Sequence, residues 1–296
     1  MSVCTKTGFL QWTSRARSRP CLGLWLHALL WSPVLGLLLF AAWSWFAFTI
    51  VIGFALVTNI VQRIIYVCLY QVCFTLSAVS MLRTLIASAP KHWPKSVMAQ
   101  LRTASPSHQR QLLSTLVARR RLPVMTRTAT DSVAFCTHCC IIKPDRTHHC
   151  RRCFRCQPRF DHHCPWLNTC IHGYNHKFFV LMLCYAAVTG VVSIFACIQF
   201  VIVWANGNLP PDGPPFAPIR LSQSALKTHL CLFPASTLSL LIAVIVLLQM
   251  HATLVRDNET TVQQIQDLKL AGTPFNTNDD INYKHPTSLR RNIEAV

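Results

Sequence analysis

The sequence predicts an all-α, multi-pass membrane protein with four transmembrane helices and a cysteine-rich domain between helices 2 and 3. The first observation is composition: of 296 residues, 52% are hydrophobic and only 13% are charged, which is more apolar than soluble globular domains usually are. The second is that the apolar residues gather in four long runs, separated by polar, arginine-rich stretches. The third is that eight of the fifteen cysteines lie between Cys136 and Cys170, after the second run and before the third.

Each of the four runs is long enough to cross a hydrocarbon core, which needs about 20 residues in a helix. The runs are Val34 to Val57, Ile64 to Leu82, Phe178 to Trp204 and Leu230 to Met250. The second is the weakest, because it contains Gln71 and ends beside Arg83. Omitting it would put the N-terminus and the basic loop on opposite sides of the membrane, so we retain four spans.

The orientation follows from the positions of the basic residues. With four spans, the N-terminal segment, the long loop before the third span and the C-terminal tail face one side and hold most of the Lys and Arg, which makes that side cytosolic. The predicted parts are a cytosolic N-terminal segment (1–33), helices 1 and 2 (34–82), a cytosolic basic linker (83–133), the cysteine-rich domain (134–177), helices 3 and 4 with a short lumenal loop (178–250), and a cytosolic tail (251–296). The Golgi or the endoplasmic reticulum is the expected membrane, and the plasma membrane is the alternative.

The net charge of +18 arises from 28 Lys and Arg against 10 Asp and Glu, and it could serve nucleic acid, anionic lipid or an acidic small molecule. Much of this charge lies between two apolar runs, close to a bilayer, so the membrane lipid bilayer is the expected partner and nucleic acid is not. The same loop is expected in the reducing cytosol. Its cysteines are therefore predicted to bind metal or to react as thiolates rather than to form disulfides.

From Cys136 to Cys170 the chain reads CTHCCIIKPDRTHHCRRCFRCQPRFDHHCPWLNTC. Three pairs in it have the Cys-x2-Cys spacing with which a tight turn brings two thiolates to one tetrahedral zinc ion. Two structural zinc sites need eight ligands, and this stretch offers eight Cys and five His. Some of these side chains are therefore left over, and a leftover thiol would be free of metal.

Cys164, in the sequence Asp161-His162-His163-Cys164, is the candidate for that spare thiol. A free cysteine is mostly protonated at neutral pH, so it gains reactivity from an imidazole that takes its proton and a carboxylate that orients the imidazole. His162 and Asp161 offer such a pair. Spacing leaves two questions open: which of His162 and His163 is the base and which a ligand, and whether Cys164 is a nucleophile or a further ligand.

The stretch from Cys136 to Phe179 resembles the zinc-binding domain of the DHHC family of protein S-acyltransferases, also called palmitoyltransferases. The resemblance rests on KPDRTHHC, on DHHCPW and on Asn175 followed by HKFF, and on the position of the domain between the second and third of four membrane helices. It implies two structural Zn²⁺ ions, one held by Cys136, Cys139, His149 and Cys156, and the second by Cys150, Cys153, His163 and Cys170.

The same resemblance implies that Asp161, His162 and Cys164 are the orienter, the general base and the nucleophile. The implied reaction moves a long-chain acyl group from palmitoyl-CoA onto Cys164 and then onto cysteine thiols of membrane-associated protein substrates. Two alternatives remain: a membrane-anchored zinc module that binds proteins without covalent chemistry, and a catalytically inactive family member.

Further residues follow from the family pattern. After the fourth helix the family usually has Thr-Thr-x-Glu near the catalytic loop, and this chain has Thr260 and Thr261 but Gln263 in place of the Glu. The chain also has His172 where a Gly is common, and Asn292 is the nearest match to a C-terminal family motif. Asn175, Thr260 and Thr261 are expected to support the site. The residues expected to contact the acyl chain are Trp166, Phe179, Met182 and Thr189.

Overall fold

The computed structural model consists of two compact units, each built from segments that are distant in the sequence. One unit contains Met1–Pro33, Ala87–His176 and Leu254–Val296, and the other contains Val34–Ile86 and Lys177–Thr253. The residues that the structure describes are 20–54, 57, 59–87, 108, 111, 115, 135–136, 138–139, 141–143, 146–206 and 223–265. The predicted N-terminal segment before residue 20, most of the basic linker, most of the lumenal loop and the tail beyond residue 265, with Asn292, lie outside the described residues.

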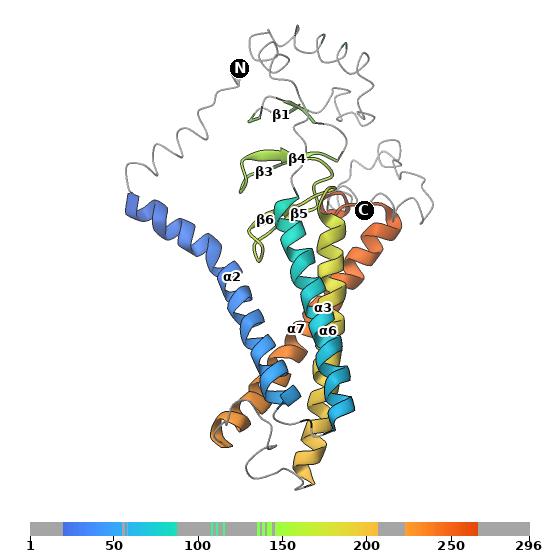
Figure 1. Ribbon diagram of the computed structural model, residues 1–296. Helices are drawn as coiled ribbons and strands as arrows, with labels where there is room; N and C mark the ends of the chain where they lie inside the picture. Colours follow the sequence, from blue (N-terminus) through green and yellow to red (C-terminus); the bar gives the residue numbers. More distant parts are fainter. Residues whose placement is uncertain are drawn as a thin grey trace, which may run out of the picture. The chain divides into compact units, whose positions relative to one another are not determined.

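Within the described residues, four helices are long and apolar enough to cross a membrane, which confirms the predicted number of spans. The elements that carry them are α2 (Pro20–Phe46) with the π-helix η1 (Ala47–Phe54), α3 (Ile60–Ile86), α6 (His176–Ala205) and α7 (Gln223–Asp257) (Figure 1). The candidate spans within them are Leu29–Gly53, Ile60–Ile86, His176–Ile202 and Lys227–Asp257. The helices extend beyond several of the predicted limits, because polar residues at helix ends interrupt the apolar pattern without ending the helix.

The start of α3 shows why the apolar pattern placed this span too late. Asn59 lies just before the helix, and its Oδ1 accepts hydrogen bonds from the backbone N–H of Val61 (3.0 Å) and Gln62 (3.1 Å). This is an N-cap, which satisfies two of the backbone donors that a helix N-terminus leaves unpaired. The helix therefore begins at Ile60, although Gln62 and Arg63 are polar.

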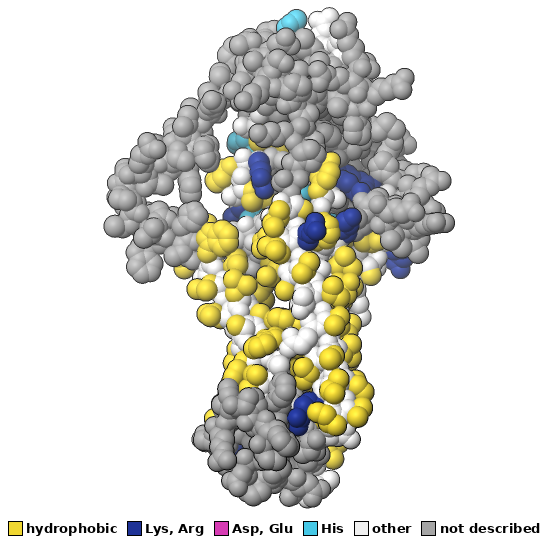
Figure 2. Space-filling model, in the orientation of Figure 1, with side chains coloured by type: hydrophobic (Ala, Val, Ile, Leu, Met, Phe, Trp, Pro, Cys, Tyr) yellow, Lys and Arg dark blue, Asp and Glu magenta, His cyan; other side chains and the backbone are white. Residues whose placement is uncertain are grey.

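The unit of Val34–Ile86 and Lys177–Thr253 contains most of the spans and is called the membrane unit. It has an apolar core with a few polar contacts between its helices. Gln71, which weakened the second predicted span, accepts from Trp45 Nε1 (3.0 Å) and donates to Thr49 (2.8 Å), so its amide is satisfied by the first span. Phe48 stacks on Tyr70 with ring centroids 4.0 Å apart. Many large hydrophobic side chains of these helices are exposed, as expected for contact with lipid, and Figure 2 shows those on one face. The buried core residues are Ala47, Phe48, Ile52, Tyr70, Ala196, Cys197 and Phe233.

In its described residues, the cysteine-rich region forms three short antiparallel hairpins, whereas the sequence analysis specified no strands there. They pair β1 (Phe135–Cys136) with β2 (Ile141–Ile142), β3 (His148–Cys150) with β4 (Arg155–Gln157), and β5 (His162–Cys164) with β6 (Thr169–Ile171). Strands of two or three residues are too short to show an alternating apolar pattern. In the structure, β3–β4 and β5–β6 each pair a histidine directly with a cysteine on the opposite strand.

Candidate active site

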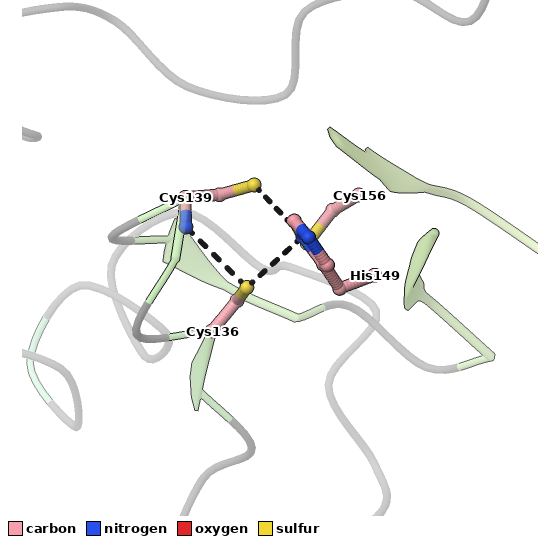
Figure 3. Close-up of side chains that lie close together, drawn as sticks. All are labelled: Cys136, Cys139, His149 and Cys156. Carbon is pink, nitrogen blue, oxygen red and sulfur yellow. Dashed lines mark hydrogen bonds between the residues drawn. The ribbon is translucent and has the colours of Figure 1, made fainter. Parts of the chain in front are cut away.

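The first Cys/His cluster consists of Cys136, Cys139, His149 and Cys156 (Figure 3). His149 and Cys156 are directly paired in the β3–β4 hairpin, whereas the two other cysteines lie at and just after the end of β1. The distances from His149 Nδ1 to the Sγ atoms are 3.6 Å for Cys136, 3.2 Å for Cys139 and 3.9 Å for Cys156. Tetrahedral Zn²⁺ with usual bond lengths would hold N and S ligand atoms about 3.6 Å apart, so these four side chains fit the ion.

The second cluster consists of Cys150, Cys153, His163 and Cys170. Here His163 and Cys170 are directly paired in the β5–β6 hairpin. The distances from His163 Nδ1 to the Sγ atoms are 3.8 Å for Cys150, 3.4 Å for Cys153 and 3.8 Å for Cys170. These again match a tetrahedral site of one nitrogen and three sulfur ligands. The two clusters contain the same residues as the two ligand sets that the family resemblance implies.

Electrostatics within the first cluster also favour a cation. A hydrogen bond with Cys156 lowers the pKa of Cys139 to about 5, and the same pairing, with burial and the negative charge on Cys139, raises the pKa of Cys156. Cys139 therefore loses its proton readily, and Cys156 resists because its charge would repel that of Cys139. A divalent cation among the sulfur atoms removes that opposition, since metal binding releases the protons of its thiol ligands.

Strand β5 distinguishes the two adjacent histidines, which sequence spacing left unassigned. Successive side chains of a strand point to opposite faces, so His162 and Cys164 share one face and His163 points to the other. His163 belongs to the second cluster, whereas Cys164, buried to 5% exposure, belongs to neither cluster. Among the described cysteines of this region, Cys164 is therefore the thiol that the two candidate metal sites leave over, and it lies on the same strand face as His162.

Asp161, His162 and Cys164 form a connected polar group. His162 Nδ1 lies 2.7 Å from Asp161 Oδ2, and Asp161 is buried. Burial alone would lower the pKa of His162, but the hydrogen bond to Asp161 and a further one to Cys164 raise it to about 9. Burial alone would raise the pKa of Asp161, but hydrogen bonds from His162 and Thr261 lower it to about 2. The carboxylate is thus charged at neutral pH, and it orients an imidazole that readily takes a proton.

Thr261 completes the environment of that carboxylate. Its backbone N–H donates to Asp161 Oδ1 (2.8 Å), and its hydroxyl lies 3.0 Å from Oδ1 and 2.9 Å from Oδ2. These two residues are 100 positions apart in the chain. The supporting role expected for Thr261 therefore has a specific geometry: its backbone N–H and its hydroxyl both contact the carboxylate that His162 Nδ1 contacts.

The segment that carries Thr261 begins with a capping box. Thr260 N–H donates to Gln263 Oε1 (3.0 Å), and Gln263 N–H donates to the Thr260 hydroxyl (3.4 Å). Gln can take the place of Glu in this reciprocal arrangement. The departure from the family's Glu therefore preserves the local structure that fixes Thr260 and Thr261.

We expect Gln263→Glu to leave the thermal unfolding midpoint nearly unchanged, because the carboxylate can accept the same hydrogen bond. Gln263→Ala removes the acceptor, and we expect it to destabilise the protein by about 0.5 to 1 kcal/mol. Thermal unfolding of the two purified variants beside the wild type checks this pair. Equal destabilisation by both substitutions would contradict the capping role.

His172 and Asn175 brace the end of the second cluster. Asn175 Nδ2 donates to the Cys170 carbonyl (2.9 Å), and Asn175 Oδ1 accepts from the His172 N–H (2.8 Å). His172 is itself buried, its Nδ1 accepts from the Tyr174 N–H (3.2 Å), and burial lowers its pKa to about 4. A neutral histidine with satisfied hydrogen bonds thus occupies the position where the family commonly has glycine.

The four residues expected to contact an acyl chain are divided between the two units. Trp166 lies in the unit of the hairpins and is 63% exposed. Phe179, Met182 and Thr189 lie on α6 in the membrane unit, where Phe179 is buried against the ring of His251 and Thr189 donates to the Tyr185 carbonyl (2.8 Å).

The sequence analysis did not anticipate a second connection between the hairpins and the end of α7. Asn258 Oδ1 accepts from Arg146 Nη1 (3.0 Å) and from Arg159 Nη2 (3.3 Å). Asn directly after a helix is a known signal for a residue with positive φ, so the helix end could have been predicted from the sequence. Its two arginine partners, 99 and 112 positions away, could not.

Comparisons with known proteins found sequences similar to this chain. The sequence model of a family described as DHHC palmitoyltransferase matches residues 129–268. Palmitoyltransferase ZDHHC15A of Danio rerio is 32% identical over 251 residues, covering 82% of this chain and 72% of the relative. Palmitoyltransferase ZDHHC15 of Xenopus laevis is 30% identical, covering 91% and 76%, and that of Homo sapiens is 32% identical, covering 80% and 68%.

Proposed function

Because this chain belongs to the DHHC palmitoyltransferase family, it is a protein S-palmitoyltransferase, and we propose that Cys164 carries the acyl group during the reaction. The observation that supports this assignment is the spare thiol. Eight Cys and His side chains form two metal-type clusters, and Cys164 lies outside both, beside His162. A nucleophile requires such a thiol, since a cysteine bound to a structural metal is not free to attack.

The proposed reaction has two half-reactions. In the first, Cys164 Sγ, having given its proton to His162, attacks the thioester carbonyl of palmitoyl-CoA. The bond from that carbonyl to the CoA sulfur breaks, and His162 returns the proton to the departing CoA thiolate. In the second, His162 takes the proton of a substrate cysteine, the substrate sulfur attacks the acyl group, and Cys164 leaves. One thioester is exchanged for another in each half-reaction, so catalysis consists mainly of positioning and thiol activation.

Asp161 supports this cycle by holding the imidazole. A histidine that alternates between neutral and protonated forms benefits from a fixed negative charge at its other ring nitrogen. The 2.7 Å contact of Asp161 Oδ2 with Nδ1 supports this role, because it leaves Nε2 for the reacting groups. Thr261 in turn fixes the carboxylate, so its two donors act on the reaction through Asp161 and His162.

We propose that each Cys/His cluster binds one Zn²⁺ ion. The ion supplies folding energy, with an apparent binding free energy of roughly 10 to 16 kcal/mol for structural sites. The hairpins need such a contribution because they contain few large buried apolar side chains, chiefly Leu167 and Ile171. Cys164 and His162 share their hairpin with two proposed ligands, so the same ions hold the reactive thiol in place.

The donor, the substrates and the location extend the proposal. Palmitoyl-CoA is the proposed donor, and cysteines of membrane-associated proteins are the proposed acceptors. Four apolar helices support a multi-pass membrane protein. We place both termini and the hairpins in the cytosol, where acyl-CoA is present, with the Golgi or the endoplasmic reticulum as the membrane. Trp166, Phe179, Met182 and Thr189 are the proposed contacts of the acyl chain.

A labelling and chase experiment tests the proposed function. Purified protein incubated with labelled palmitoyl-CoA is expected to acquire a covalent label that hydroxylamine removes, as it removes a thioester. Addition of a protein bearing an accessible membrane-proximal cysteine is expected to move the label onto that protein. Absence of the adduct would favour the zinc-module or inactive alternatives. A label that forms but never moves would contradict the two-step transfer.

Thr261→Val is expected to slow adduct formation about tenfold, because it removes a hydroxyl donor from a buried carboxylate and leaves the backbone donor in place. Thr261→Ser retains the hydroxyl and is the matched control, with a rate near that of the wild type. Initial rates at saturating palmitoyl-CoA provide the measurement. If Thr261→Val and Thr261→Ser form the adduct at the same rate, the Thr261 hydroxyl does not contribute to the reaction through Asp161.

A further inference from the structure

The end of α7 is a fixed structure in which Asn258 has a defined place. Asn258 has a φ of 54°, its N–H donates to the Val255 carbonyl (3.2 Å), and the Glu259 N–H donates to the Leu254 carbonyl (2.9 Å). This pair of bonds around a left-handed residue is the Schellman motif, which ends a helix and sets the direction of the chain that follows. Asn tolerates this conformation better than other residues with a Cβ atom.

The side chain of Asn258 joins this helix end to two arginines near the hairpins, which belong to the same compact unit as Asn258. Its Oδ1 accepts from both Arg146 (3.0 Å) and Arg159 (3.3 Å), and both arginines have positive φ, at 61° and 43°. Their turns are also joined directly, since the Phe160 N–H donates to the Arg146 carbonyl (2.9 Å). Phe160 immediately precedes Asp161, so the amide of Asn258 is anchored to the backbone that leads into the DHHC sequence.

Asn258 and Thr261 therefore bind the same loop from one short segment. Three positions separate them in the sequence, and Thr260, which lies between them, is held by its capping box with Gln263. The first anchor is the contact of Asn258 with the two arginines, and the second is the contact of Thr261 with Asp161. Hydrogen bonds from charged donors are stronger than those from neutral donors. Because both donors of the first anchor are arginines, that anchor can fix the position of the second.

We propose that Asn258 is a positioning residue, whose amide oxygen, held by Arg146 and Arg159, sets the place at which Thr261 meets Asp161. The inference rests on the proposed function of Asp161, His162 and Cys164 and extends their support to a residue outside the Thr-Thr-x-Glu pattern. Asn258 contacts no reacting atom. Its effect on the reaction passes through Thr261, Asp161 and His162 in turn.

Substitutions at this position separate the side-chain contact from the helix end. Asn258→Gly keeps the left-handed conformation, since glycine is the residue most common at that place, and it loses only the amide. Asn258→Asp keeps an acceptor oxygen for both arginines. Arg256→Gln is the matched control on the same segment, because Arg256 is exposed and pairs with the adjacent Asp257 (3.1 Å), an ion pair of little consequence at a surface.

The test measures the initial rate of hydroxylamine-labile adduct formation from palmitoyl-CoA. We expect Asn258→Gly to lower kcat about tenfold with little change in KM, and Asn258→Asp and Arg256→Gln to stay within about twofold of the wild type. In a double-mutant cycle, Asn258→Gly should have less than about a twofold further effect in a Thr261→Val background. A wild-type rate for Asn258→Gly, or a full multiplication of the two effects, would overturn the proposal.

A second readout does not depend on activity. Hydrogen exchange of peptides that include Thr261 is expected to quicken in Asn258→Gly and to remain slow in Asn258→Asp, while the zinc content of all variants stays the same. Unchanged exchange in Asn258→Gly would overturn the positioning role. If the wild type forms no adduct, the proposed function fails, and hydrogen exchange still decides whether Asn258 fixes Thr261.

Discussion

Cys164→Ala is expected to abolish the palmitoyl adduct and to leave two zinc ions bound per chain. The substituted thiol is the proposed nucleophile, and loss of a nucleophile costs at least about a thousandfold in rate. The metal content should not change, because Cys164 belongs to neither Cys/His cluster. Labelling with palmitoyl-CoA and metal analysis of the same preparation measure both quantities. The combination separates a catalytic thiol from a structural one, since replacing a metal ligand would remove metal and activity together.

Cys184→Ala is the matched control for this experiment. Cys184 is an exposed cysteine on α6 and belongs to neither cluster, so its replacement should leave the adduct and the zinc intact. An adduct of undiminished amount on Cys164→Ala would show that the acyl group is carried elsewhere. Loss of zinc from Cys164→Ala would assign this thiol to a metal site and would favour the zinc-module reading.

Cys170→Ser is expected to have the largest effect on the structure. Cys170 is fully buried, it pairs with His163 in the β5–β6 hairpin, and it belongs to the second cluster. Replacing a thiolate ligand weakens a site that supplies roughly 10 to 16 kcal/mol of folding energy. Because Cys164 is on the partner strand of the same hairpin, we expect loss of the adduct together with loss of at least one zinc per chain. Zinc content and susceptibility to limited proteolysis measure the change.

His138→Ala is the matched control, because it removes a residue of a type that binds metal from a position outside both clusters. His138 is exposed, its ring lies 4.9 Å from that of His149, and it belongs to neither cluster. The variant should keep both zinc ions and its resistance to protease. If Cys170→Ser keeps two zinc ions and a folded hairpin region, the second cluster does not depend on this ligand and its proposed role is wrong.

The membrane part of the fold could be predicted because lipid imposes a simple requirement on the sequence. Every span must be a long apolar helix, so the long apolar runs indicated four of them, the second with support from the placement of the basic residues. The limits were less accurate, because helix ends are decided by local hydrogen bonds such as the Asn59 cap on α3. The π-helix Ala47–Phe54 also had no signal in the apolar pattern, since its residues are as hydrophobic as those of the preceding helix.

The candidate site could be predicted only as far as its local motifs extended. Spacing indicated zinc and a spare thiol, but it did not separate His162 from His163. Strand β5 separates them, because alternate side chains point to opposite faces, and a strand of three residues leaves no pattern by which to predict it. The support of Asp161 by Thr261 joins residues 100 positions apart, and such contacts depend on tertiary structure.

The most direct measurement is the position of the acyl group on the wild-type protein, determined by mass spectrometry of peptides after brief reaction with palmitoyl-CoA at low temperature. We predict a thioester-linked acyl group on the peptide that contains Cys164, which hydroxylamine removes and a substrate thiol displaces. An acyl group found instead on Cys170, Cys153 or another cluster cysteine, with Cys164 unmodified, would contradict the account.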